Sequence, residues 1–188
     1  LALDGWLGEP PVAWHPVVWM GRALHWWGEW LAPPAPVARD FKRFWLAAVV
    51  WIGLVAIVSI VFWAAQQLVL MLPGWLAAAL LALLLKPLLA WRMLRDEVLA
   101  VEVALGQSLA AGRAQLARLV SRDVSALSAE EVRESAIESL AENLNDSVVA
   151  PLLWFALLGL PGAALYRFAN TADAMWGYPG MRGGRHWQ

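Results

Sequence analysis

The sequence contains no cysteine and few charged residues. Without cysteine there is no disulfide framework, and no thiolate is available as a nucleophile or zinc ligand. Only 15% of the 188 residues are charged and 61% are apolar, whereas a soluble domain is roughly 45–50% apolar and about 25% charged. The net charge of −1 provides no excess of cations for a phosphate backbone. Nucleic acid is therefore not expected as the main partner.

Charge is completely absent from Phe44 to Leu85. A membrane-crossing helix needs roughly 20 apolar residues, and Pro73-Gly74 divides this stretch into two pieces. The sequence therefore predicts a transmembrane hairpin over residues 44–91. Backbone groups in lipid must bond to one another within the segment. We thus expect an all-α fold, that of a polytopic helical membrane protein.

Fourteen tryptophans are present, and indole rings favour the headgroup region of a bilayer. Several lie where an interfacial belt is expected, and packing in a core is the alternative for some of them: Trp26, Trp27, Trp30, Trp45, Trp75 and Trp91.

Basic residues flank the predicted hairpin, and its turn carries no charge. The flanking cations are Arg39, Lys42 and Arg43 before it, and Arg92 and Arg95 after it. Basic residues mark cytoplasmic loops, so both outer ends of the hairpin are expected on the cytoplasmic side. Lys86, near the end of the second arm, is expected to snorkel toward the same side.

The chain is predicted to form a single membrane-embedded domain of four blocks. They are a Trp/Pro-rich N-terminal block (1–43), the hairpin (44–91), a cytoplasmic helical insert (92–146), and a broken membrane helix with a polar motif (147–188). In the first block we expect a helix near Val17–Leu31, which the prolines from Pro33 onward end.

The insert is rich in Ala, Leu, Glu and Arg, with expected breaks at Gly106 and Gly112. Ser128-Ala129-Glu130-Glu131 is a capping box, and Leu127 and Val132 are spaced as its hydrophobic staple. A helix is therefore expected from about Ala129 toward Asn145. The apolar run that follows, Val148–Leu165, is interrupted by Gly159-Leu160-Pro161-Gly162. It is either a re-entrant, broken helix or one tilted and kinked span.

Three carboxylates stand four residues apart just before that apolar run: Glu138, Glu142 and Asp146. On a helix this spacing puts them on one face, with Asn145 beside them. Acids at a membrane surface are costly and tend to be functional, and oxygen ligands suit Mg²⁺ together with phosphate. A solvated helix face is the alternative, and it is favoured for Glu130, Glu131 and Glu134.

A second polar cluster follows the interrupted run. Arg167, Asn170 and Asp173 stand three apart; an arginine there suits a phosphate or carboxylate, and a capped helix end is the alternative. Arg122 either forms a loop ion pair with Asp123 or holds a phosphate. His15 precedes a proline and is expected in extended backbone, where packing is as good an explanation as chemistry.

Together these strings resemble the adenosylcobinamide-phosphate synthase family, the membrane-bound cobinamide synthases of cobalamin biosynthesis. The matching strings are DGWLGEP from Asp4, HPVVWMG from His15, RDV from Arg122, ESLAENLNDSVVAPLLW from Glu138, GLPGAALYR from Gly159 and NTADAMWGY from Asn170. The family's C-terminal part, with further Asp- and Asn-rich motifs, is not in this sequence, so the chain is expected to stop short of it.

The resemblance implies an ATP-dependent ligase that joins aminopropanol or its phosphate to a propionate of adenosylcobyric acid. The expected intermediate is an acyl phosphate, with ATP and Mg²⁺ as cofactors. Our mechanistic hypothesis for this reaction gives the residues the following roles: Glu138, Glu142 and Asp146 hold the metal, Arg122 and Arg167 neutralise phosphoryl charge, Asn143, Asn170, Thr171 and Asp173 orient substrate or complete the metal shell, and His15 takes a proton from the amine.

Location and partners follow from the same reading. The expected protein is a multi-pass protein of the cell (inner) membrane with its active face in the cytoplasm, where ATP is found. Its partners are the corrinoid substrate, aminopropanol (phosphate) and the lipid bilayer; a homo-oligomer or association with other enzymes of the pathway stays open. Two further classes remain: a non-catalytic membrane sensor or scaffold, which binds no nucleotide, and a transporter with intramembrane acids, which turns over no ATP.

Overall fold

A computed structural model describes residues 13, 15–34, 40–177 and 179–187. The DGWLGEP string and Arg39 lie outside these residues. The described chain is helical except for one short antiparallel hairpin, which confirms the all-α prediction. Its described residues form two compact units: an insert unit within 89–150, and a membrane unit within 13–88 and 151–187. Whether they form one membrane-embedded domain stays a prediction.

Helix α2 of the membrane unit runs from Pro16 to Leu31. His15, the residue before it, is extended as expected, and Pro16 occupies the first helical position, where its missing N–H costs nothing. The helix ends at Leu31 because Ala32 turns extended before Pro33. The predicted helix is confirmed.

Helix α3, Phe41–Leu70, is the first arm of the predicted hairpin. At a rise of about 1.5 Å per residue its 30 residues span roughly 45 Å, more than the ~30 Å of a hydrocarbon core. None of its residues is buried. A helix that is apolar on all sides and has no fully buried residue in the described chain is suited to lipid as its solvent, which confirms the first arm.

The second arm, α4 (Gly74–Leu85), has only 12 residues. A 3₁₀ turn, η2 (Lys86–Leu88), ends it, and Pro87 within this turn has no backbone N–H to continue the α-helical hydrogen bonds. Alone α4 is too short to cross a bilayer. Only together with η2 and α5, as one broken span, is the segment long and apolar enough to do so. Snorkelling of Lys86 is wrong, since its residue surface is only 6% exposed.

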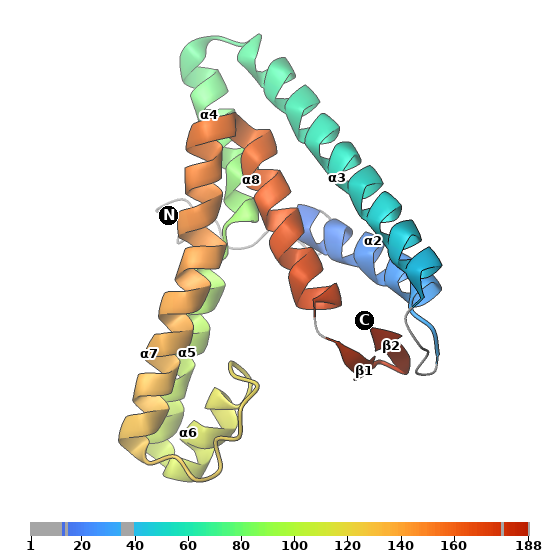
Figure 1. Ribbon diagram of the computed structural model, residues 1–188. Coiled ribbons are helices and arrows are strands. Elements are labelled where there is room, and N and C mark those ends of the chain that lie inside the picture. Colours follow the sequence, from blue (N-terminus) through green and yellow to red (C-terminus); the bar gives the residue numbers. More distant parts are fainter. Residues whose placement is uncertain (1–12, 14, 35–39, 178, 188) are drawn as a thin grey trace. The chain divides into compact units, whose positions relative to one another are not determined.

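Helix α8, Ala150–Trp176, is interrupted at Gly159. Gly159 has φ 72° and ψ −157°, outside the helical region, and Pro161 follows in the next turn. The chain turns back there, so α8 consists of two arms (Figure 1). Gly162 lets the second arm approach the Trp154 carbonyl, where a side chain would clash. The predicted break is confirmed; the choice between a re-entrant helix and one kinked span stays a prediction.

Gln66 of α3 fixes this turn. Its Oε1 accepts the Leu160 N–H at 2.6 Å, the first backbone donor after the interruption. Gly159 lies directly against the same side-chain amide. A polar side chain in an otherwise apolar helix thus satisfies a backbone group that the broken helix leaves without its usual partner.

A short β-hairpin follows α8 in the membrane unit. Helix α8 continues to Trp176, and β1 (Gly180–Arg182) then pairs with β2 (Arg185–Trp187). Gly183 and Gly184, at φ 57° and 72°, form the two-residue turn. The His186 N–H donates to the Pro33 carbonyl at 2.8 Å. The hairpin is thereby attached to the segment that follows α2.

The insert unit contains α5 (Trp91–Gln107), α6 (Leu109–Leu116), α7 (Ala129–Leu144) and η3 (Asn145–Val149). Helices α5 and α7 lie side by side, with α6 at one end (Figure 1). Their shared core consists of apolar side chains from all three helices and the loop after α6: Val101, Leu116, Val124, Val132 and Ala136.

Local signals in the insert have mixed outcomes. The capping box forms in both directions: Ser128 Oγ accepts the Glu131 N–H at 3.3 Å, and Glu131 Oε2 accepts the Ser128 N–H at 2.6 Å. Leu127 and Val132 join the same apolar cluster. The break near Gly106 is confirmed by the end of α5. A break at Gly112 is wrong, because Gly112 lies within α6, pressed against Leu105.

Candidate functional site

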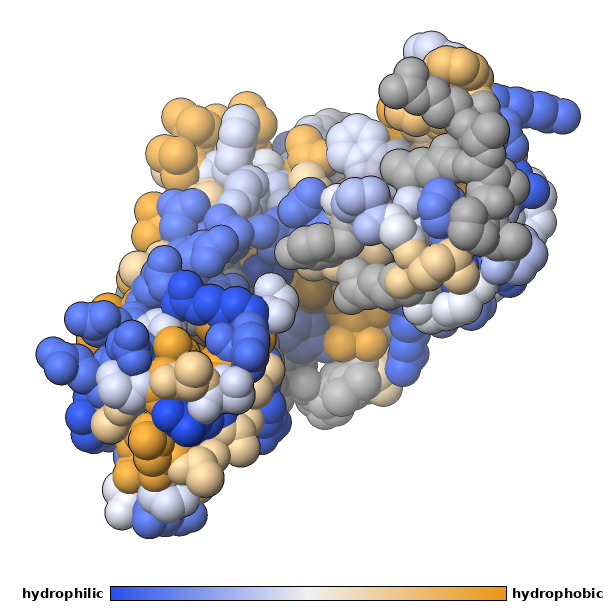
Figure 2. Space-filling view, turned by 60° about the horizontal axis from the view of Figure 1, so that its bottom comes forward, coloured by the Kyte–Doolittle hydropathy of each residue, from blue (hydrophilic) through white to orange (hydrophobic). Residues whose placement is uncertain are grey.

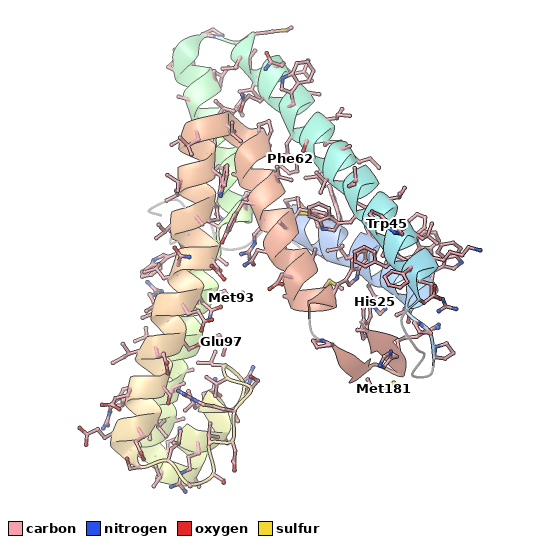
Figure 3. The ribbon with its side chains drawn as sticks, viewed as in Figure 1. His25, Trp45, Phe62, Met93, Glu97 and Met181 are labelled. Atoms are coloured by element: carbon pink, nitrogen blue, oxygen red, sulfur yellow. The ribbon has the colours of Figure 1, made fainter. Side chains whose placement is uncertain are left out.

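The insert unit contains an open cavity of about 320 Å³. It lies between α5, the segment after α6, and the junction of α7 with η3. Met93 and Glu97 project from the same side of α5 (Figure 3). The full lining is Ala90, Met93, Leu94, Glu97, Arg118, Leu119, Asn143 and Ser147. Polar and apolar groups thus share a space the size of a small-ligand site.

A π-helical turn shapes one wall of this cavity. Over Asn145–Val149 the helix widens, and the Ala150 N–H bonds to the carbonyl of Asn145, five residues back. The Ser147 carbonyl accepts the Ala90 N–H at 3.2 Å, which links η3 to the start of α5. Such turns occur frequently at functional sites. No sequence signal predicts this π-helical turn. Because Asp146 lies in the turn, the regular α-helical spacing assumed between Glu142 and Asp146 is altered.

Polar side chains around the cavity hold one another in place. Arg118 Nη2 lies 3.8 Å from Glu97 Oε1, and Gln115 Nε2 donates to Glu97 Oε2 at 3.3 Å. Asn143 Nδ2 donates to the Ser139 carbonyl at 2.8 Å. Within the described residues, the Asn143 amide oxygen accepts no hydrogen bond, which makes it available to a ligand.

Of this lining only Asn143 is a predicted site residue. Glu97, Arg118 and Ser147 were missed. Glu97 and Arg118 precede the ESLAENLND string by tens of residues and belong to no recognisable motif. Glu97 and Arg118 come close to Asn143 only because α5 and α6 pack against α7.

Arg122 forms an ion pair, but with α7 rather than with Asp123. Its Nη2 donates to Glu138 Oε2 at 2.7 Å and to Ser135 Oγ at 2.8 Å. The two charged side chains are 52% and 68% exposed, so the pair contributes at most about 1 kcal/mol. The contact orients the guanidinium through one nitrogen and leaves its other donors without a partner among the described residues.

The three carboxylates Glu138, Glu142 and Asp146, here called the acidic row, differ in their contacts. Glu138 is engaged by Arg122, whereas the Glu142 carboxylate is exposed and makes no hydrogen bond or ion pair with any described residue. Asp146 lies in η3 and accepts a bond from Asn145 Nδ2 at 3.1 Å. Across the described ranges no three His, Asp or Glu side chains converge on one metal position. Since Mg²⁺ takes one or two carboxylates plus phosphate and water, its binding here stays a prediction.

Asp123 stabilises the loop that carries Arg122. Its carboxylate accepts the Ser125 backbone N–H at 2.9 Å and the Ser125 hydroxyl at 3.1 Å. These hydrogen bonds favour the ionised form and hold the pKa of Asp123 below its usual value. Around this loop and α7, Figure 2 shows hydrophilic side chains gathered over the insert, with apolar ones between them.

The remaining predicted site residues lie in the membrane unit. Arg167, Asn170, Thr171 and Asp173 follow one another along the second arm of α8, and the spacing of three is helical as expected. Thr171 Oγ1 donates to the Arg167 carbonyl at 2.7 Å. His15 is half-buried just before α2. That these residues meet the acidic row in one active site stays a prediction.

Comparisons with known proteins agree on one family. A family model described as CobD/Cbib protein matches residues 1–184. The probable cobalamin biosynthesis protein CobD of Methanothermobacter thermautotrophicus is 40% identical over 176 residues, 94% of this chain and 55% of that protein. The Thermococcus kodakarensis protein of that name is 42% identical over 183 residues, 97% and 58% respectively. The cobalamin biosynthesis protein CobD of Brucella suis is 37% identical over 189 residues, 95% and 55%. The chain thus spans a little more than half the length of these relatives. No solved structure matches it.

Proposed function

Because the chain belongs to the CobD/Cbib family of cobalamin biosynthesis, we propose that it takes part in ATP-dependent amide-bond formation. The proposed substrates are adenosylcobyric acid and aminopropanol or its phosphate, and the product is adenosylcobinamide (phosphate). The observation that supports this most is the half-polar cavity of the insert, with Asn143 in its wall. The ESLAENLND string that supplies Asn143 also supplies the uncommitted carboxylate of Glu142.

The proposed chemistry starts from a poor electrophile. A propionate carboxylate does not condense with an amine in water, so its oxygen attacks the γ-phosphorus of ATP, and the bond to ADP breaks. The amine nitrogen then attacks the acyl carbon of this acyl phosphate. Inorganic phosphate leaves, and the amine proton passes to a base, for which His15 is the candidate.

The residues of the insert fit the phosphate side of this reaction. Arg122, held by Glu138 and Ser135, directs its remaining donors to a phosphoryl group without having to be reoriented. Arg118 is fixed by Glu97 at the cavity. The amide oxygen of Asn143 accepts a hydrogen bond from a substrate or from a metal-bound water.

Glu142 and Asp146 are the residues that would hold Mg²⁺, with Glu138 assigned to Arg122 instead. Mg²⁺ supplies neutralisation of the phosphate charges when bound. The fit rests on the free carboxylate of Glu142 and on the hard oxygen donors next to it. In the membrane unit, Arg167, Asn170, Thr171 and Asp173 are proposed to contact substrate. The proposed location is the cell membrane, with both polar clusters at its cytoplasmic face.

The first experiment measures Mg²⁺-dependent ATP binding by calorimetry on detergent-purified protein. Glu142→Gln is compared with Glu134→Gln, an equally exposed acid two turns earlier on α7. We expect Glu142→Gln to weaken Mg²⁺-dependent binding by about tenfold or more, equal to ~1.4 kcal/mol, while Glu134→Gln changes it less than twofold. Unchanged binding in Glu142→Gln contradicts the metal role.

The second experiment tests the reaction itself. Purified protein is incubated with adenosylcobyric acid, aminopropanol phosphate and ATP, and the corrinoids are analysed by mass spectrometry. We expect ATP-dependent formation of the amide and release of phosphate. If folded protein binds no ATP and forms no amide, the non-catalytic sensor or scaffold replaces the ligase.

A further inference from the structure

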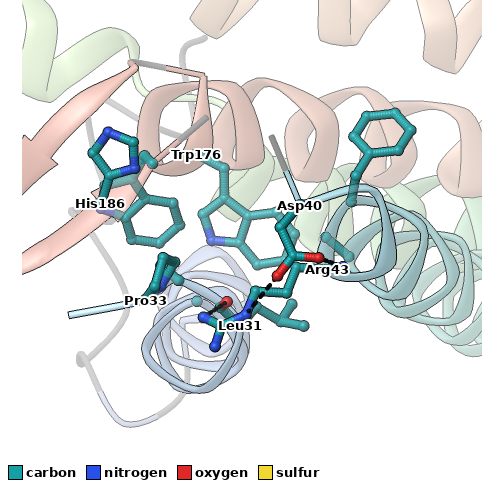
Figure 4. A pocket seen from close by; sticks show the side chains of 11 residues that line it. Leu31, Pro33, Asp40, Arg43, Trp176 and His186 are labelled. Atoms are coloured by element: carbon teal, nitrogen blue, oxygen red, sulfur yellow. Dashed lines mark hydrogen bonds and ion pairs between the residues drawn. The ribbon is translucent and has the colours of Figure 1, made fainter. Parts of the chain in front are cut away.

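The membrane unit contains a second cavity, of about 270 Å³, which the proposed reaction does not use. It lies where the C-terminal end of α2, the N-terminal end of α3, the end of α8 and the β-hairpin meet (Figure 4). Aromatic and charged side chains share its wall. The charged and aromatic side chains in the wall are Asp40, Arg43, Phe44, Trp176, His186 and Trp187.

Two tryptophans form a fixed apolar wall. The rings of Trp176 and Trp187 are stacked, with centroids 6.5 Å apart and an interplanar angle of 30°. Trp176 Nε1 donates to the Leu24 carbonyl at 3.1 Å, which sets the orientation of its ring. Gly28 allows the Trp187 ring to lie directly on α2, because a Cβ there would come within 2.5 Å of it.

Arg43 presents hydrogen-bond donors at the edge of the cavity. Its Nε lies 3.2 Å from Asp40 Oδ2, and its Nη1 donates to the Leu31 carbonyl at 3.4 Å. Both oxygens of Asp40 are engaged by Arg43, since the other accepts the Arg43 backbone N–H. The guanidinium is therefore held in one orientation, and within the described residues its Nη2 donates to nothing.

His186 contributes a second polar group. Its Nδ1 is buried and has no hydrogen-bond partner among the described residues, while its backbone N–H is bonded to Pro33. A buried polar atom without a partner is costly and calls for a ligand group or water.

The residues around the cavity are of the kinds found at the boundary between a bilayer and water. Its α3 residues belong to the first two turns of the apolar helix that has no buried residue. Trp26, Trp30 and Trp45, all more than 60% exposed, surround the same end of α2 and α3. Exposed tryptophans and a basic residue at the end of an apolar helix mark the boundary between hydrocarbon and water.

We propose that this cavity binds the phosphate-bearing end of a small amphiphile. A phosphate oxygen accepts a hydrogen bond from Arg43 Nη2, and the adjoining apolar part lies along Trp187 and Phe44, with His186 in the same wall. At about 270 Å³ the space is at or below the lower end of drug-sized pockets, so it admits a headgroup or short-chain ester and not a corrinoid. The ligand comes either from a membrane phospholipid or from a soluble phosphate monoester.

Calorimetry on the protein in dodecyl maltoside distinguishes these sources with three probes: dihexanoyl phosphatidylglycerol, hexyl phosphate and inorganic phosphate. We expect an ester probe to bind more tightly than inorganic phosphate. Tighter binding of the phospholipid identifies a lipid site, and tighter binding of hexyl phosphate identifies a soluble ester. Equal binding of inorganic phosphate and both esters, or binding of none of the three, overturns the proposal.

Three variants locate the site. Arg43→Gln removes the donor, His186→Gln alters another polar side chain of the wall, and Ala47→Leu fills the cavity without changing charge. Lys42→Gln is the matched control, because it removes the neighbouring cation, which does not line the cavity. We expect about tenfold weaker binding for Arg43→Gln and Ala47→Leu, a smaller loss for His186→Gln, and less than twofold for Lys42→Gln. Equal losses in Arg43→Gln and Lys42→Gln indicate general charge attraction and overturn the site.

Discussion

Helices α3 and α7 are both long and regular, but they are stabilised in opposite ways. Helix α3 has no buried residue, whereas α7 buries one stripe of small side chains, Val132, Ser135, Ala136 and Ser139, against the insert. Arg133 of α7 also forms a two-point ion pair with Glu102 of α5. The stability of α7 depends on neighbours in the chain, and that of α3 on an apolar solvent. Substitutions should therefore affect the two helices differently.

The largest difference is expected for leucines. Leu116 is fully buried in the insert core. Leu116→Ala should lower the free energy of unfolding by about 2–5 kcal/mol, because the substitution leaves a cavity. Leu68→Ala on α3, where Leu68 is 66% exposed, should change the thermal midpoint in detergent very little. Far-UV circular dichroism during heating measures both. Equal destabilisation would mean that α3 also packs against protein.

Gln66 of α3 contacts α8 through a hydrogen bond from within the apolar part of the helix. Gln66→Leu removes the acceptor of the Leu160 N–H and should cost about 1–3 kcal/mol, since a backbone donor is left unsatisfied away from water. Gln67→Leu is the control, as this adjacent amide makes no hydrogen bond to a described residue. Thermal unfolding in detergent measures the difference, and a Gln67→Leu effect as large as that of Gln66→Leu contradicts a specific clamp.

The start of α7 depends on its capping box. Ser128→Ala removes the acceptor for the Glu131 N–H and should lower the stability of the insert by about 1 kcal/mol. Ser121→Ala, on an exposed serine of the preceding loop, should have no measurable effect. Hydrogen exchange of the first turn of α7, read by mass spectrometry, reports the loss locally. Unchanged exchange in Ser128→Ala would show that packing alone fixes this end.

The smallest effect is expected from Asp123, because it is fully exposed. Its folded-state pKa is lowered from 3.8 by hydrogen bonds from Ser125, so its contribution is present above the unfolded pKa and is lost as the pH falls through the folded value. The wild type should exceed Asp123→Asn in thermal midpoint at pH 7, and this difference should shrink toward pH 3. A difference that grows on acidification contradicts the assigned hydrogen bonds.

Much of the fold could be predicted because its signals are local. The apolar run of α3, the prolines after α2, the Ser128 capping box and the Gly159–Gly162 interruption each act within a few residues of the chain. The shortness of α4 does not follow from hydropathy, because the apolar run continues to Leu85 and beyond Lys86. The signal for the end of the helix is Pro87. The β-hairpin was missed because its strands have three residues each, too few to show an alternating pattern.

The candidate site could be predicted only in part. Asn143, Glu142 and Asp146 stand out because they are polar residues packed into one short string before an apolar run. Glu97 and Arg118 carry no such mark, and neither does the partner of Arg122, which the sequence offered as the adjacent Asp123. Which residues become neighbours of such side chains depends on which helix faces meet, and this is a property of the packing.

The sequence alone determined that this protein is helical and suited to a membrane, and where its helices break, since hydrophobicity and backbone restrictions are properties of neighbouring residues. Only the tertiary structure decided that Glu138 is committed to Arg122 while Glu142 is left available. It also decided that Gln66 caps the interrupted helix and that two cavities lie between helices. Each of these depends on groups distant in the chain, whose meeting is fixed by packing geometry rather than by local pattern.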